Sequence, residues 1–323
     1  MPALRVKFWG TRGSIPYALE SSSLREKLAR AVVAAAGKNF RDLDEARAWI
    51  DRELEFKTSH TFGGNTACVQ LDAGGPEHVL CDLGSGVRVF GNRVLARDGA
   101  GKGNVYHVLM SHMHWDHIMG FPFFTPAYIP GNKIRIYGCH RELEEALRGQ
   151  QSAPCFPVSF DRLSADIEFV TLRPGQSSDI AGWRVTPQLQ NHSGDSYGYR
   201  FEREGRSVVY STDSEHKLEN PESTKNFVDF FKDADLVIFD SMFSLADAVS
   251  IKEDWGHSSN VVGVELCQLA GAKHLMLFHH EPAYDDDRIA TIWQETLRLE
   301  EITRASGRPL KISAAYDGLE IEL

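Results

Sequence analysis

Short hydrophobic runs, many of them next to glycine, proline or charged residues, alternate along the chain with stretches in which apolar residues recur at helical spacing. Short runs favour β-strands, and a period near 3.6 residues favours helices. The pattern predicts strands at residues 5–9, 66–71, 78–81, 106–110, 133–137, 197–202, 207–210, 236–239 and 273–278, with more β-structure within 167–195. It predicts helices at residues 24–35, 42–54, 141–147, 260–271 and 288–304. This is an α/β protein, in which the first three strands would form a β-meander followed by the strand at 106–110.

The first two predicted helices interrupt the run of strands. Leu24, Leu28 and Val32 follow helical spacing, and Gly37 can end the first helix. We interpret residues 17–59 as a helical insertion within a single domain of residues 1–323. An amphipathic helix pair must bury its apolar face. The insertion would therefore be a lid over the functional site, a contact in a homodimer, or a pair of helices packed on the outside of the domain.

The strongest chemical signal is the run from His112 to His117, His-Met-His-Trp-Asp-His, which follows the strand predicted at 106–110. An extended exit from that strand would put His112 and His114 on one side, with Asp116 and His117 following as the chain turns. Imidazoles and a carboxylate suit zinc and similar divalent ions, and two metals can share such a group. One histidine in a loop is ordinary, but three with an aspartate at this spacing indicate a metal site.

Other polar side chains also follow predicted strands or lie in loops. They are His192, Asp213, Asp240, His257 and His279. Such positions commonly converge in layered α/β folds, so distance in sequence need not mean distance in space. Taken alone, His192 could be a surface-loop histidine, Asp213 a turn former and His257 a neighbour of a helix N-cap.

Composition and charge narrow the class of protein. The 323 residues are 42% hydrophobic and 25% charged, as in soluble globular proteins. A formal net charge of -10 disfavours a nonspecific grip on a nucleic-acid backbone. The N-terminus leads into a strand instead of a signal peptide, no apolar run could span a bilayer, and the five scattered cysteines fit reduced thiols. We expect a cytoplasmic protein with no membrane partner.

The order of the motifs resembles the metallo-β-lactamase superfamily, and within it the subgroup of ribonuclease Z and the small cyclic phosphodiesterases. The resemblance runs from Arg5 to about Asp287, interrupted by residues 17–59. Its pieces are 8–14 (Phe-Trp-Gly-Thr-Arg-Gly-Ser), 64–66 (Gly-Asn-Thr), 82–86 (Asp-Leu-Gly-Ser-Gly), 111–120, 210–213 (Tyr-Ser-Thr-Asp), 256–258 (Gly-His-Ser) and 278–279 (Phe-His). It implies a four-layer αββα sandwich with two metals at one edge.

The resemblance also implies seven metal ligands in two groups that share one carboxylate. One metal would be held by His112, His114 and His192, the other by Asp116, His117 and His279, and both by Asp213. His280 competes with His279, but the family pattern places the ligand directly after the strand, here after Phe278. Zinc is the default metal for this ligand set, while manganese or iron can occupy similar sites.

The implied reaction is hydrolysis by a water that the two metals activate. Asp116 and Asp213 would hold and orient this water, while His257 would protonate the leaving alkoxide and Asp240 would orient His257. In ribonuclease Z the matching carboxylate is a glutamate, so the shorter Asp240 departs from the pattern. Lactonases, thioesterases and β-lactamases can use the same metals, and the Gly-His-Ser feature favours a phosphodiesterase.

A compact substrate is expected. No Gly- and basic-rich arm like that of ribonuclease Z is found between Lys133 and Gln190, and the chain is acidic. We therefore predict a small cyclic phosphodiester, either a cyclic nucleotide or a ribose cyclic phosphate, and no large nucleic acid. The alternatives are a lactonase, thioesterase or β-lactamase-like hydrolase, an RNA-processing nuclease, and a non-catalytic ligand sensor.

Two further sets of side chains have open roles. Arg12 and Arg88 lie beside glycine-rich loops and could touch a phosphate or form surface salt bridges. An aromatic cluster could stack on a base or belong to the core. Its members are Phe121, Phe123, Phe124 and Tyr128.

Overall fold

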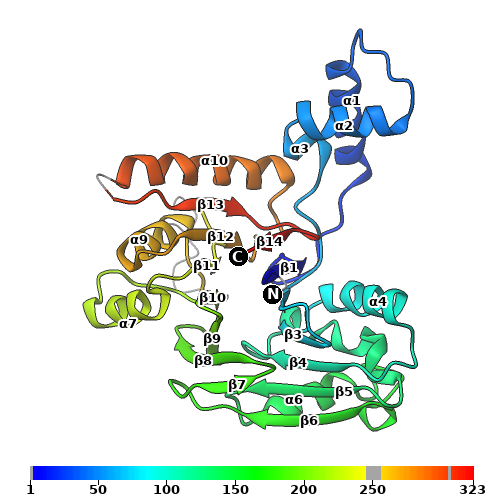
Figure 1. The fold of residues 1–323 in the computed structure, drawn as a ribbon, viewed down its shortest axis with the longest axis vertical. Helices are drawn as coiled ribbons and strands as arrows, with labels where there is room; N and C mark the ends of the chain where they lie inside the picture. The colour runs from blue at the N-terminus through cyan, green and yellow to red at the C-terminus, as the bar shows by residue number, and fades with distance from the viewer. Residues whose placement is uncertain (1–2, 245–255, 305–306) are drawn as a thin grey trace.

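Two seven-stranded β-sheets face each other, and helices pack on the outer face of each, in the computed structural model, which describes residues 3–244, 256–304 and 307–323 (Figure 1). One hydrophobic cluster fills the space between the sheets, and two others lie between a sheet and its helices. This arrangement confirms the predicted αββα sandwich.

The first sheet has the strand order β14-β1-β2-β3-β4-β5-β6. Its strands are Arg5–Gly10 (β1), Cys68–Asp72 (β2), Glu77–Cys81 (β3), Val105–Leu109 (β4), Lys133–Gly138 (β5), Asp166–Thr171 (β6) and Glu320–Glu322 (β14). β1, β2 and β3 are antiparallel and form the predicted meander, whereas β3 to β6 are parallel. A parallel pair needs a crossover connection, and α4 (Gly86–Asp98), which the pattern did not predict, supplies it between β3 and β4.

The second sheet has the order β13-β12-β11-β10-β9-β8-β7. Its strands are Ser178–Ile180 (β7), Trp183–Gln190 (β8), Ser196–Arg203 (β9), Arg206–Ser211 (β10), Leu236–Asp240 (β11), His274–Phe278 (β12) and Lys311–Ala314 (β13). β7 to β10 are antiparallel, and β10 to β13 are parallel. The helices of this half are Pro221–Phe231 (α7), Asn260–Ala270 (α9) and Asp286–Thr303 (α10).

Short helices connect the strands of the first sheet after β4. They are Trp115–Ile118 (α5), Phe121–Phe123 (η1), Thr125–Tyr128 (η2), Leu143–Gln150 (α6) and Phe160–Arg162 (η3). Phe121 and Phe124 are fully buried in the outer cluster of this sheet, so core packing is their role. Phe123 is 56% exposed and contacts the ring of Phe156, so the four aromatic side chains do not form one stacking surface.

Residues 17–59 contain α1 (Ser21–Ala34), α2 (Leu43–Glu53) and α3 (Phe56–Ser59), and Figure 1 shows α1 and α2 projecting away from the sheets. α1 buries none of its residues, and Val32 is 72% exposed. Lys27 joins the segment to the start of α10 through an ion pair of 2.8 Å with Asp286. The helices therefore touch the sandwich along one edge and leave much apolar surface open.

In the described part of the chain, no helix has the combination of length and apolarity that crossing a bilayer requires.

Candidate metal centre

The candidate residues gather where parallel strands of both sheets end. In the first sheet, Asp82 follows β3, and the motif 112–117 follows the neighbouring strand β4. In the second sheet, Asp240 ends β11, and Asp213 and His279 come just after β10 and β12 on either side of it. Because the carboxyl ends of parallel neighbours lie at one edge, residues distant in sequence meet there.

Four buried side chains point one ligand atom each into a common space: Asp116, His117, Asp213 and His279. Nε2 of His117 lies 3.2 Å from Oδ2 of Asp116 and 3.2 Å from Oδ1 of Asp213. Nε2 of His279 lies 3.2 Å from each of the same two oxygens and 3.3 Å from Nε2 of His117. Edges of this length belong to a tetrahedron with about 2.0 Å from centre to corner, the usual zinc-to-ligand distance. We call these four residues the buried group.

A second set, His112, His114 and His192, also brings its ring nitrogens together, and we call it the open group. Nε2 of His192 lies 3.1 Å from Nδ1 of His114. Oδ2 of Asp213 lies 3.6 Å from Nε2 of His112 and 3.8 Å from Nε2 of His192, so the two oxygens of Asp213 face different groups. Nε2 of His112 is buried and has no hydrogen-bond partner in the described structure. Coordination of a metal ion by this nitrogen would explain why it lacks one.

Hydrogen bonds to the candidate ligands fix the direction of their rings. Nδ1 of His117 donates to Oδ2 of Asp82 at 2.7 Å, and Nδ1 of His192 donates to the carbonyl of Gly256 at 2.8 Å. Asp82 is itself held by Tyr210, whose hydroxyl donates to Oδ2 at 2.7 Å. Such outer partners leave Nε2 free to bind a metal. Ligand spacing did not reveal the role of Asp82, although its place directly after a strand was a usable signal.

Backbone conformation at this edge is unusual. Asp82, Asp213 and His279 have φ values of 61°, 47° and 60°, in the left-handed region that residues other than glycine seldom adopt. Each such residue costs on the order of 1–3 kcal/mol and persists only where its surroundings hold it, often at functional sites. Close packing adds a second constraint, because a β-carbon at Gly13 would lie 2.5 Å from Cε1 of His279.

Electrostatics favour a cation here. Burial alone would lower the pKa of His117, but the charges of Asp213, Asp116 and Asp82 outweigh it and raise this pKa well above its usual value. Burial, aided by neighbouring His117, holds the pKa of His112 well below its usual value, and a neutral imidazole is the form that binds metal. The donor set, its charge and its spacing therefore fit a zinc-sized divalent ion.

His257 and Asp240 lie beside both groups. Nδ1 of His257 donates to Oδ2 of Asp240 at 2.8 Å. The centre of the His257 ring lies 5.2 Å from that of His192 in the open group and 5.2 Å from that of His279 in the buried group. Burial opposes protonation of His257, but the charge and hydrogen bond of Asp240 prevail and raise its pKa to about 9. A protonated imidazole next to a metal site can act as an acid.

Other candidates lie elsewhere or are used differently. Nε2 of His280 donates to the carbonyl of Ala315 at 2.8 Å, so His280 turns away from the group that contains His279. Arg88 is exposed on α4, whereas Arg12 is fully buried and forms no surface salt bridge with any residue that the structure describes. Trp115, between two candidate ligands, is 78% exposed, and its position in the motif predicts no role for it.

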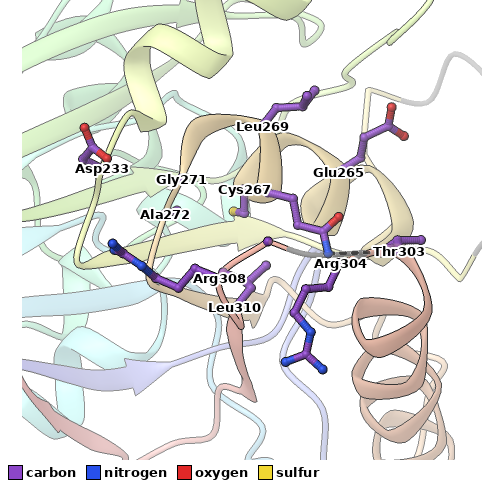
Figure 2. Close-up of a pocket in the computed structure, with 12 residues that line it drawn as sticks. Asp233, Glu265, Cys267, Leu269, Gly271, Ala272, Thr303, Arg304, Arg308 and Leu310 are labelled. Atoms are coloured by element: carbon purple, nitrogen blue, oxygen red, sulfur yellow. Dashed lines mark hydrogen bonds between the residues drawn. The ribbon is translucent and has the colours of Figure 1, made fainter.

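A cavity of about 500 Å³ lies away from this edge, next to the C-terminal ends of α9 and α10 (Figure 2). Asp233, Cys267, Arg304 and Arg308 are among the residues that line it. It contains none of the candidate ligands, so the functional site is assigned from the histidine and aspartate cluster and not from cavity size.

Comparison with known proteins places this architecture in a family. The Beta-lactamase superfamily domain matches residues 77–280, more than half of the chain. Ribonuclease Z of Bradyrhizobium diazoefficiens is 24% identical over 274 residues, which cover 70% of this chain and 87% of the relative. Among solved structures, YhfI of Bacillus subtilis (TM-score 0.64, 17% identity) and yeast PDE1 (TM-score 0.66, 16% identity) each align over 100% of both chains.

The chain therefore belongs to the beta-lactamase superfamily, and the class that its fold and relatives define is that of hydrolases. Within the superfamily its sequence lies near ribonuclease Z, as the order of its motifs predicted. The fold implies divalent metal ions, and the two histidine and aspartate groups are where this chain could hold them.

Proposed function

We propose that the protein is a binuclear metal-dependent phosphodiesterase that cleaves a small cyclic phosphodiester, such as a cyclic nucleotide or a ribose cyclic phosphate. The observation that carries this proposal is the His257–Asp240 pair, 2.8 Å apart, set beside both ligand groups. A metal centre alone suits several hydrolases. A proton donor matters most when the leaving group is an alkoxide, as in a phosphodiester.

In this proposal the open group would hold one ion and the buried group the other, and Asp213 would contribute a carboxylate oxygen to each. Zinc suits the ligands, and manganese or iron remain alternatives. When bound, such ions supply a nucleophilic water near neutral pH and neutralise charge on a phosphoryl oxygen. Asp116 and Asp213 would orient that water through their carboxylates.

His257 would give its proton to the leaving oxygen, while Asp240 keeps the ring oriented and charged. Asp240 is in turn held by two backbone donors, the amides of Ser214 and Met242, each at 3.1 Å. The carboxylate is therefore fixed before substrate arrives, which reduces the reorganisation that proton transfer requires. The pair is shorter by one methylene than the glutamate version, yet its hydrogen bond is of normal length.

The relatives support phosphodiester chemistry, since the one described above is named Ribonuclease Z. Two features argue for a smaller substrate than RNA. The net charge is -10, and residues 133–190, all described, form β5, α6, η3 and β6 to β8 without an extended arm. We also propose that residues 17–59 are an insertion in a single domain, whose exposed apolar helix face suits a homodimer contact.

The decisive experiment is a substrate panel run together with elemental analysis of the purified protein. We expect two divalent ions per chain, hydrolysis of bis-p-nitrophenyl phosphate, and turnover of at least one cyclic nucleotide or ribose cyclic phosphate. Inactivity of the metal-loaded protein toward every phosphodiester would refute the proposal. Preference for lactones or thioesters, unaffected by His257→Ala, would support the alternative hydrolase.

A further inference from the structure

Arg12 is a fully buried arginine whose hydrogen bonds all go to backbone carbonyls. Nε donates to Gly63 at 2.9 Å, and Nη1 donates to Glu281 at 3.2 Å and to Tyr284 at 2.7 Å. Among the described residues it forms no ion pair within 4.0 Å. Burying a charge without a paired carboxylate is costly. We therefore expect the hydrogen bonds of Arg12 to be needed to hold the loops at residues 63 and 281–284 in place.

These loops contact the buried group directly. Beside Arg12, the amide of Gly13 donates to the carbonyl of His280 at 3.0 Å, and the amide of His280 donates to the carbonyl of Thr11 at 3.0 Å. This pairing aligns the 10–14 segment with the residue that follows the ligand His279. The amide of Ser14 then donates to Oδ2 of Asp116 at 2.8 Å.

The same segment therefore touches both Asp116 and His279, whose Oδ2 and Nε2 atoms lie 3.2 Å apart in the buried group. The outer contacts of the open group come from elsewhere, for example from Gly256 to His192 and from Ser111 to His112. The ring centre of Tyr17, the first residue of the 17–59 segment, lies 4.2 Å from the guanidinium carbon of Arg12, so the ring covers the guanidinium group.

We propose that Arg12 is a positioning residue for the buried group, holding Asp116 and His279 at metal-binding distance without touching metal or substrate. The inference rests on the proposed function in requiring two ions. It goes beyond it by making one ion depend on Arg12 and the other not. Lysine cannot replace arginine here, because a single ammonium lacks the planar fork of donors that reaches three carbonyls.

Arg12→Lys is the test, with Arg200→Lys as a matched control. Arg200 also donates to two backbone carbonyls, those of Phe230 at 2.9 Å and Lys232 at 3.0 Å, but on β9 and away from the ligands. Zinc affinity and stoichiometry are measured by equilibrium dialysis with elemental analysis, and folding is measured by thermal melting. We expect Arg12→Lys to lower the affinity for one of the two zinc ions by about 10–100-fold, the range for changes in residues that support metal ligands. Arg200→Lys should leave both zinc affinities unchanged.

A pair of backgrounds identifies which ion is affected. In His192→Ala, which damages the open group, adding Arg12→Lys should weaken the remaining zinc ion. In His279→Ala, which damages the buried group, adding Arg12→Lys should not change the affinity for the remaining zinc ion. Equal effects in both backgrounds, or wild-type zinc binding by Arg12→Lys, would overturn the inference. The wild-type protein tests the proposed function separately. If it binds fewer than two ions or has no phosphodiesterase activity, the proposed function is wrong whatever the effect of Arg12→Lys.

Discussion

The two ligand groups have different access to solvent. All four members of the buried group are buried, and their ligand atoms are 3.2 to 3.3 Å apart along five edges. In the open group His114 is exposed and His192 is half-buried. Closed tetrahedral sites are typical of firmly held metal, whereas catalytic sites keep a position open. We infer that the buried group sets affinity and that substrate approaches through the open group.

The largest effect is expected at the residue that both groups share. Asp213→Ala removes an oxygen from each group, so both zinc affinities should fall by more than about 100-fold, beyond the range for outer-shell changes, and hydrolysis should fall to background. Dialysis and the substrate panel measure both. Asp233→Ala is the control, because Asp233 also has a positive φ, 53°, but lies by the remote cavity. Retention of one tight ion by Asp213→Ala would show that the groups do not share a ligand.

His257→Ala should separate chemistry from metal binding. With the proton donor gone, turnover of a cyclic phosphodiester should fall by about 10²–10⁴-fold, while both ions stay bound. Esters whose leaving group is p-nitrophenolate need little protonation and should lose much less. Comparing kcat for the two substrates measures the difference. An equal loss on both, or loss of metal, would contradict the role assigned to His257.

Asp82→Asn tests whether the buried group is the tighter one because of its outer contacts. The amide weakens the acceptor for Nδ1 of His117, now 2.7 Å from Oδ2 of Asp82, so zinc affinity of the buried group should fall by about 10–100-fold. The affinity of the open group should change little. Ser177→Ala, in a polar contact far from the ligands, is a control. A parallel drop in both affinities would erase the distinction between the groups.

The smallest expected effect concerns a buried histidine outside both groups. His216 packs 4.1 Å from the Phe227 ring centre, and neither ring nitrogen has a partner in the described structure. Burial lowers its pKa to about 4, so the unfolded chain takes up this proton first, and stability falls as pH drops from about 6.5 through 4. His216→Leu should stabilise the protein by about 1 kcal/mol at pH 7 and by more at pH 5.

Urea unfolding at the two pH values measures this prediction. If His216→Leu were as acid-sensitive as the wild type, His216 would not be the group that titrates. The result also sharpens the comparison of the two ligand groups, since it shows how a buried imidazole titrates when no carboxylate is hydrogen-bonded to it.

The sequence identifies the candidate ligands but not the residues that surround them. His112 to His117 are local and recognisable, but Asp82 matters only because the fold brings it to His117. Helix α4 was missed because Gly86 and Gly91 suggest turns. Gly91 is needed for packing instead, since a β-carbon there would lie 2.9 Å from the Phe124 ring. The three-residue strand β14 is too short to give a periodic signal.

The positions of the candidate ligands also bear on how the two sheets are held together. His112 to His117 are attached to the first sheet, whereas His192, Asp213 and His279 are attached to the second. Ions held by both sets would link the sheets at one edge. Their binding would raise the free energy of unfolding by about 4 kcal/mol when free metal is a thousandfold above its Kd. Chelation would then loosen the seam between the sheets before it loosened either sheet.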